Sequence, residues 1–266
     1  MANKKSFLEK QIEAVEDRLF KLDQIKTTFM LFLVAFSIST PLLFLYLLSQ
    51  LLSHKINKFL GILSLIELPV ILIFAIISKR YLNSLIRENK EELKTKKKER
   101  DAEVQVQEFL KKSLTEDYQV FSNIFTGYGD VDAVVVGPTG VYAIEVKSNS
   151  GTVAENSKSR LIVIDGEKPH KDYRRQAIAN SNIIKKILDN ATGLKTFVWP
   201  VLVFPFASIM TKDMILESPK DNYKVPVLGV KELIEYIYSN KQDTLSKDLI
   251  DKYSEALKDM HIIEDD

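Results

Sequence analysis

The chain has 266 residues, of which 45% are hydrophobic and 27% charged, and its formal net charge is +1. This composition is too apolar for a disordered chain, and the length suits one catalytic-sized domain with a smaller part beside it. Cysteine is absent, which excludes disulfide-stapled domains, thiol catalysis and cysteine-ligated metal sites, and the three histidines are too far apart in sequence to suggest a zinc site.

The charge is unevenly distributed. Residues 79–112 contain eleven Lys/Arg and seven Asp/Glu, whereas residues 113–266 contain 18 and 23. The C-terminal part therefore lacks the basic excess that is typical of a free DNA-binding domain. The basic excess follows a hydrophobic region instead.

Two apolar runs lie in the N-terminal part. Residues 27–52 carry no charge, and residues 59–78 carry only Glu67. Each run is long enough for a helix to cross a hydrocarbon core of about 30 Å. Because the connecting loop is short, we expect a transmembrane α-hairpin over 27–78, preceded by a cytoplasmic amphipathic helix over 1–26 and followed by a charged helical linker over 79–101.

Lys and Arg flank this hairpin on its outer sides more densely than in its loop. The positive-inside rule then predicts a protein of the inner (cytoplasmic) membrane with two spans and both termini in the cytoplasm. The expected partners are the lipid bilayer and a second copy of the chain through the hairpin and its flanking helices.

Glu67 has either a functional role or a structural or oligomer-contact role. The basic run 94–100 is either a solvated helix face or a contact for anionic lipid or nucleic acid.

The C-terminal part has an α/β pattern. A helix is expected from Ala102, followed by strands over 118–125, 131–137, 141–148 and 160–164, a helix over 173–188 and an apolar strand over 196–206. A short strand over 225–228 and helices over 231–239 and 244–260 follow. We therefore expect a mixed sheet flanked by helices, with a core domain at 102–210 and an α/β extension at 211–266.

The turn at Gly137–Gly140 predicts a hairpin in which Val136 faces Val141. In that register Asp132 lies opposite Glu145, and Lys147 shares their face. Facing carboxylates repel each other, so the pair needs a proton, a cation or a metal, and Mg²⁺ or Mn²⁺ suits oxygen ligands. Lys147 could then orient or help deprotonate a water and offset phosphate charge. The alternative is an exposed polar strand face with a surface ion pair.

The segment GDVDAVVVGPTGVYAIEVKSNSG, residues 129–151, resembles the signature of the NERD (nuclease-related domain) family, a branch of the PD-(D/E)XK nuclease-like superfamily. The resemblance covers about 102–206 and implies an αβββαβ core. It also implies Asp132, Glu145 and Glu103 as metal ligands, Lys147 as the catalytic lysine and Gln176 as a group that positions metal, water or phosphate. The chain departs from the family or its relatives in having Ala102 for Gly, Ala133 for His and Asn180 for Tyr.

Together these features lead us to expect a membrane-anchored, divalent-metal-dependent nuclease. It would act on nucleic acid, DNA more than RNA, on the cytoplasmic side, in processing of or defence against foreign DNA. Two other readings stay open: a catalytically inactive nuclease-like scaffold that assembles at the membrane, and a channel-like hairpin gated by the cytoplasmic domain. The complete set of Asp132, Glu145 and Lys147 favours the enzyme, since a scaffold has no physical need of it.

Overall fold

The computed structural model describes residues 6–52, 58–126, 129–157, 160–211, 214–217, 223–240 and 244–260, without the side chains of 37–39, 41–43, 47, 51, 58–71 and 259. The chain forms two compact units. One unit comprises Lys10–Lys96, and the other comprises the residues up to Glu9 together with those from Lys97 onward. Each unit is described by itself below.

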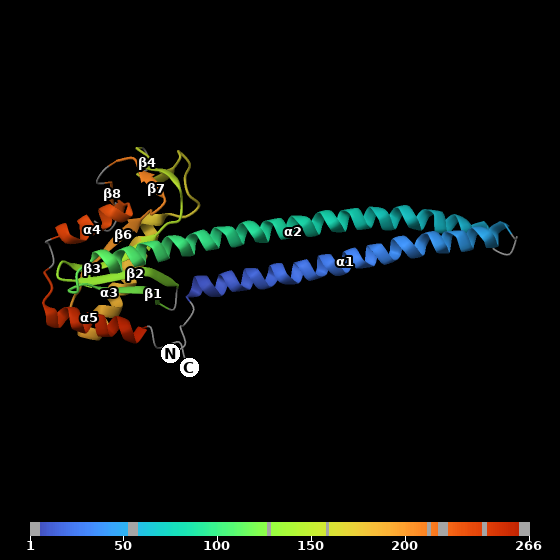
Figure 1. The fold of residues 1–266 in the computed structure, drawn as a ribbon. Helices are drawn as coiled ribbons and strands as arrows, with labels where there is room; N and C mark the ends of the chain where they lie inside the picture. The colour runs from blue at the N-terminus through green and yellow to red at the C-terminus, as the bar shows by residue number, and fades with distance from the viewer. Residues whose placement is uncertain are drawn as a thin grey trace. The chain divides into compact units, whose positions relative to one another are not determined.

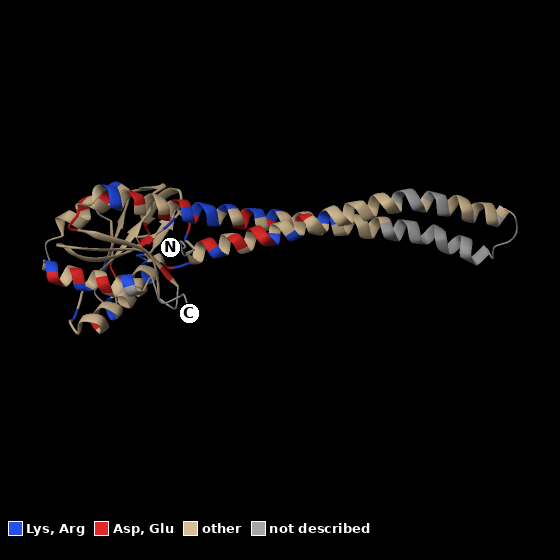
Figure 2. Ribbon diagram, turned by 60° about the horizontal axis from the view of Figure 1, so that its bottom comes forward, with Lys and Arg blue, Asp and Glu red and all other residues tan. Residues whose placement is uncertain are grey.

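The unit Lys10–Lys96 consists of parts of two long helices, α1 (Phe7–Leu52) and α2 (Lys58–Ser113). The two helices run side by side (Figure 1), and Arg18 of α1 forms an ion pair with Glu92 of α2 at 3.0 Å. Charged residues are concentrated in α1 before residue 27 and in α2 after residue 78, and Figure 2 shows them gathered along one stretch of each helix. The predicted helices are therefore present, and their charged ends contact each other.

The helix α2 is continuous where the sequence suggested a linker and a separate helix. Residues 79–113 contain neither Gly nor Pro, so nothing in this segment ends the helix. Residues 97–113 of α2 therefore belong to the second compact unit.

Large apolar side chains are exposed along both helices. Among the described side chains of the two predicted apolar runs, those more than half exposed are Leu31, Phe32, Val34, Leu45, Tyr46 and Leu52 on α1 and Leu72, Ile73, Phe74 and Ile77 on α2. Within the described residues, neither helix has a stretch that is long and apolar enough to cross a membrane. The structure does not describe most side chains of the predicted second span, and that of Glu67 is among them.

The second unit is built on a six-stranded mixed sheet with the strand order β1-β2-β3-β6-β9-β8. The strands β3, β6 and β9 are parallel to one another, whereas β1, β2 and β8 pair antiparallel with their neighbours. Their bounds are β1 Gln119–Phe125, β2 Asp130–Gly137, β3 Gly140–Val146, β6 Val198–Val203, β8 Ile215–Glu217 and β9 Lys224–Leu228.

A second, three-stranded sheet has the order β5-β4-β7, with β4 at Gly151–Glu155, β5 at Ile162–Ile164 and β7 at Ala207–Ile209. The sequence predicted β5 but not β4, β7 or β8. The strands β7 and β8 have three residues each, and the segment of β4, GTVAE, shows no apolar alternation. Such strands exist because a neighbour offers hydrogen bonds, and their own sequence does not signal them.

Helices cover both faces of the larger sheet (Figure 1). The end of α2 and α4 (Val230–Ser239) pack on one face, where Ala102, Val106, Leu110, Leu233 and Ile237 are buried together. The helices α3 (Tyr173–Thr192) and α5 (Lys247–Met260) pack on the other, with Ile184, Leu188, Ile250, Tyr253 and Leu257 in its core. The expected α/β class, a mixed sheet flanked by helices, is confirmed.

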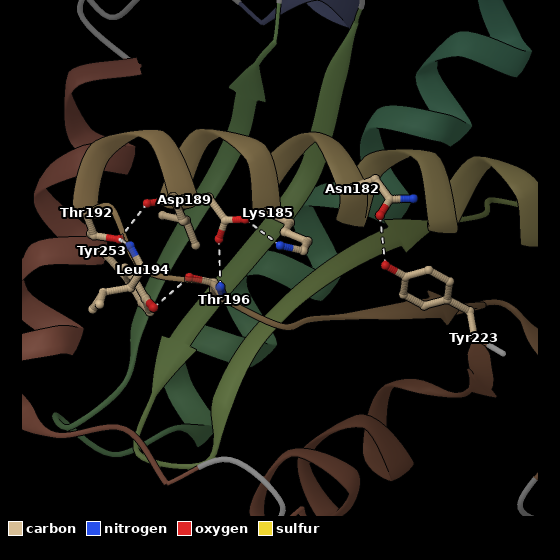
Figure 3. Close-up of polar contacts among 9 residues, drawn as sticks. Asn182, Lys185, Asp189, Thr192, Leu194, Thr196, Tyr223 and Tyr253 are labelled. Carbon is tan, nitrogen blue, oxygen red and sulfur yellow. Dashed lines mark hydrogen bonds and ion pairs between the residues drawn. The ribbon is translucent and has the colours of Figure 1, made fainter. Parts of the chain in front are cut away.

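The helix α3 is fixed at both ends. The Asp172 side chain caps its N-terminus by accepting from the Arg175 N–H, and Gly193 ends it in the left-handed conformation. Near the C-terminal end, Asp189 pairs with Lys185 and accepts a hydrogen bond from the Thr196 N–H at 2.7 Å (Figure 3). Thr196 in turn contacts the Tyr253 hydroxyl of α5 at 2.6 Å. These contacts hold α3 in place against the sheet, and its other turns reach the candidate site.

Candidate active site

The hairpin of β2 and β3 has the predicted register, with Val136 paired to Val141. The ladder stops at Ala133 and Ile144, one pair short of the predicted opposition of Asp132 and Glu145. There Asp132 Oδ2 accepts a hydrogen bond from the Val146 N–H at 2.7 Å. The side chain of Asp132 thus takes the place of a ladder bond and ties the end of β2 to the end of β3.

Glu145 lies at the end of β3, on the side of the sheet that α3 covers. Only 2% of its surface is exposed. The Lys147 ammonium donates to Glu145 Oε1 at 2.5 Å, and its own side chain is 14% exposed. The alternative of an exposed polar face with a surface ion pair is therefore wrong. A buried charge pair needs good geometry and further hydrogen bonds, because desolvation of both charges opposes it.

The helix α3 supplies those further contacts. Gln176 Oε1 accepts from Lys147 Nζ at 3.0 Å, and Asn180 Nδ2 donates to Glu145 Oε2 at 2.6 Å. The Tyr173 ring lies 4.8 Å from Lys147 Nζ, which is a cation–π distance. The three residues follow one another at spacings of three and four along one side of α3. One helix face therefore holds both members of the charge pair.

The helix α2 borders the same site. Its positions Ala102, Val106 and Leu110 are buried in the core, and the neighbouring stripe carries Glu103 and Gln107. Gln107 Nε2 donates to the backbone carbonyl of Asp132 at 3.2 Å. Packing of the apolar stripe therefore fixes the direction in which Glu103 and Gln107 face.

Three carboxyl groups of the site have raised pKa values. The pKa of Glu103 is raised to about 8, mainly by burial and also by the nearby charges of Glu99 and Glu145. Burial also raises the pKa of Asp132 well above its usual value, and the charges of Glu145 and Glu103 add to this. The pKa of Glu145 is raised by burial, although Lys147 and Asn180 counteract the rise. Three neighbouring acids with raised pKa values favour either protonation of their carboxyl groups or the binding of a cation beside them.

The donor set can be tested against a divalent ion. Among the described residues, no three acidic or histidine side chains lie close enough together to form a metal-binding group. Mg²⁺ and Mn²⁺, however, are commonly held by one or two carboxylates, waters and substrate phosphate. Glu145 keeps lone pairs for a further contact, since a carboxylate offers about four and two are used here. Asp132 and Glu145 could therefore supply carboxylate oxygens to such an ion, whereas Glu103 does not complete a three-ligand group with them among the described residues.

Residues 98–205 match the nuclease-related domain, NERD. No curated protein and no solved structure matches the chain. The NERD segment contains the end of α2, the strands β1 to β6 and α3. All the residues of the candidate site therefore lie within the NERD domain, and the predicted family resemblance is confirmed for this segment.

The NERD domain brings the predicted site residues together. Hydrogen bonds connect Lys147 with Glu145 and Gln176, and Asp132 is bound to the end of the same strand. Glu103 joins them through its charge, because it raises the pKa of Asp132. The catalytic and metal-binding roles of these five residues remain predictions.

Two contacts of the charge pair were missed from the sequence, those of Tyr173 and Asn180. Asn180 was considered only through the family resemblance, as the asparagine downstream of Gln176 and as a departure from the tyrosine of related branches, and no contact was assigned to it. Their spacing from Gln176, three residues before and four after, is the signal that could have revealed them. That signal is weak without knowing which side of α3 faces Glu145.

Proposed function

We propose that the chain is a membrane-anchored nuclease that depends on a divalent metal ion and hydrolyses phosphodiester bonds of nucleic acid, DNA more than RNA. The reaction would take place on the cytoplasmic side of the inner membrane, in processing of or defence against foreign DNA. The observation that carries the proposal is the hydrogen-bonded cluster of Asp132, Lys147 and Gln176 around the buried Glu145, inside the segment that matches the nuclease-related domain.

Asp132 and Glu145, with Glu103 beside them, would hold Mg²⁺ or Mn²⁺. When bound, such an ion polarises the phosphorus–oxygen bonds and makes a coordinated water a better nucleophile. In hydrolysis the water oxygen forms a bond to phosphorus while the bond to the sugar oxygen breaks. The water loses a proton and the leaving sugar oxygen gains one, so the reaction needs no other reactant.

Lys147 would stabilise negative charge on the phosphate. Its contacts to Glu145, Gln176 and Tyr173 all use the ammonium as a donor or as a positive charge, which suits electrostatic stabilisation. Gln176 orients the ammonium by accepting a hydrogen bond from it. Glu103, whose pKa is raised to about 8, can hold a proton near neutral pH and release it when a cation approaches.

Membrane anchoring is supported by the sequence and by exposure. The run 27–52 has no charged residue, and the run 59–78 has one. Large apolar side chains in both runs, such as Leu31, Phe32 and Phe74, are more than half exposed. A bilayer or a second copy of the hairpin would cover these exposed apolar side chains.

Binding of nucleic acid calls for positive charge, and residues 113–266 carry an acidic excess. The basic part of α2 compensates for this within the same chain, because Lys97, Lys98 and Arg100 lie directly before Glu103 on the helix. Lys98 Nζ reaches Ser150 Oγ after β3 at 3.1 Å, which places this cation beside the loop that follows Lys147. Contacts of cations with phosphates supply most of the non-specific affinity for nucleic acid.

The nuclease is tested with the full chain in detergent micelles. Linear, circular and single-stranded DNA and RNA are incubated with Mg²⁺, Mn²⁺ or EDTA, and products are separated on gels. We expect cleavage that requires the metal and disappears in Asp132→Asn. The matched control is Asp248→Asn on α5, which loses an exposed ion pair with Lys252 and should cleave like the wild type. Absence of both cleavage and Mn²⁺ binding in the wild type would favour the inactive scaffold.

Anchoring is tested by labelling, which the absence of cysteine makes simple. His54→Cys lies between the two apolar runs, and Ser157→Cys lies in the loop after β4. In bacterial spheroplasts a membrane-impermeant maleimide should label the first variant from outside and the second only after lysis. Labelling of both in intact spheroplasts, or release of the chain from membranes by alkaline carbonate, would contradict the proposed topology.

A further inference from the structure

We propose that Asn180 is a positioning residue that holds the Glu145 carboxylate in the orientation required for metal binding. The inference rests on the proposed function, because it concerns the same site. It goes beyond that function in naming a residue of α3 that touches neither the substrate nor the metal and still sets the affinity for the metal.

The first argument is geometric. The two oxygens of Glu145 are held separately, Oε1 by Lys147 at 2.5 Å and Oε2 by Asn180 at 2.6 Å. The terminal torsion of a glutamate is broad when nothing restricts it. A donor on each oxygen fixes the plane of the carboxylate. A divalent ion that shares Oε1 must weaken the Lys147 contact, whereas the Asn180 contact lies on the other oxygen.

The second argument concerns charge. A buried carboxylate with an unsatisfied oxygen is costly, so Oε2 needs a donor. A lysine or arginine at position 180 would satisfy it, but a second positive charge would repel a divalent cation. The amide of Asn180 donates a hydrogen bond and carries no net charge. It is therefore the kind of donor that stabilises the ionised Glu145 without competing with a metal ion.

The third argument concerns rigidity. Asn180 lies in the middle of α3, three residues after Ala177 and four before Ile184, which are both fully buried. The caps at Asp172 and Gly193 fix the ends of the same helix. The amide is therefore presented to Glu145 from a packed, capped element. Outer partners of this type determine the direction of a ligand's lone pairs.

The test compares variants of the full chain in detergent. Asn180→Leu has nearly the same size and removes the donor, and Asn180→Gln keeps an amide donor. The control is Asn182→Leu, which lies on the same helix and loses an exposed hydrogen bond with Tyr223 (Figure 3). The dissociation constant for Mn²⁺ is measured by electron paramagnetic resonance, and the urea midpoint is measured in EDTA. Cleavage is measured under single-turnover conditions at saturating Mn²⁺.

We expect Asn180→Leu to bind Mn²⁺ about 10–100-fold more weakly than the wild type. Asn180→Gln should retain more of the affinity, and Asn182→Leu should match the wild type. A merely structural role would lower the urea midpoint of Asn180→Leu and leave the Mn²⁺ affinity within twofold of the wild type, which would overturn the proposal. If Asn180→Leu does not fold, Asn180→Ser, which is too short to reach Glu145, takes its place with the same expectation.

The failure of this inference is distinguishable from failure of the proposed function. Wild-type chain that binds Mn²⁺ and cleaves nucleic acid, together with an Asn180→Leu variant of unchanged affinity, overturns the role of Asn180 alone. Wild-type chain that neither binds Mn²⁺ nor cleaves overturns both.

Discussion

Replacement of Lys147 by methionine is expected to lower the rate of metal-dependent cleavage by about 10²–10³-fold, the range found when one electrostatic group of an active site is removed. Methionine keeps most of the length of the side chain and removes its charge. The loss should appear in the single-turnover rate at saturating Mn²⁺, because Lys147 is assigned to charge on the phosphate. The measurement is single-turnover cleavage of end-labelled DNA by the full chain in detergent.

The matched control for this variant is Lys185→Met. Lys185 also pairs with a carboxylate, that of Asp189, but it lies near the C-terminal end of α3 and its side chain is 32% exposed (Figure 3). The pair is partly exposed to solvent, Lys185 makes no contact in the candidate site, and Asp189 keeps its contact with the Thr196 N–H, so this variant should cleave at the wild-type rate. Equal rates for Lys147→Met and the wild type would remove Lys147 from the mechanism.

Replacement of Glu103 by glutamine is expected to stabilise the metal-free protein at alkaline pH. In the folded protein, burial and the neighbouring acidic charges raise the pKa of Glu103 to about 8, from about 4.5 for a glutamate in water. Between these two pH values the folded chain keeps a proton that the unfolded chain has lost, so the free energy of unfolding falls as pH rises. Glutamine resembles the protonated acid and removes this dependence. At pH 8 and above the gain is on the order of a few kcal/mol.

The measurement is urea unfolding in EDTA from pH 5 to pH 8.5, for the wild type and Glu103→Gln. The control is Glu108→Gln, an exposed position on the same helix, which should leave the pH profile unchanged. If Glu103 is a metal ligand, the same variant that stabilises the metal-free protein should bind Mn²⁺ more weakly. Identical pH profiles for the wild type and Glu103→Gln would show that Glu103 is not buried in its acid form.

The candidate site was largely predictable because its central part is local. Asp132, Glu145 and Lys147 lie on two strands joined by a short turn, and the alternation of a strand places Glu145 and Lys147 on one face. The requirement for glycine at the turn also has a simple steric reason. A Cβ at Gly137 would lie 2.0 Å from the Tyr118 ring, so the hairpin needs glycine there.

The rest of the site could not be read in this way. Nothing in the spacing of the hairpin indicates that Glu145 is almost wholly buried, because α3 and β6 cover it from other parts of the chain. The contacts of Asn180 and Tyr173 depend on which side of α3 faces the sheet. The opposition of Asp132 and Glu145 was extrapolated from the register, but the ladder ends before that pair because the Asp132 side chain binds the Val146 N–H.

The amino-acid sequence by itself determined the order of the main elements, the hairpin register, the apolar stripes of β3 and α2 and the segment that carries the nuclease-related signature. These follow from periodicity and turn residues, which act over a few positions. The tertiary structure alone decided the short strands β4, β7 and β8 and the burial that raises the pKa values of Glu103, Asp132 and Glu145. It also decided which side chains of α3 contact the Lys147–Glu145 pair. Desolvation and hydrogen bonding between distant segments have no local pattern, because they arise only when those segments pack together.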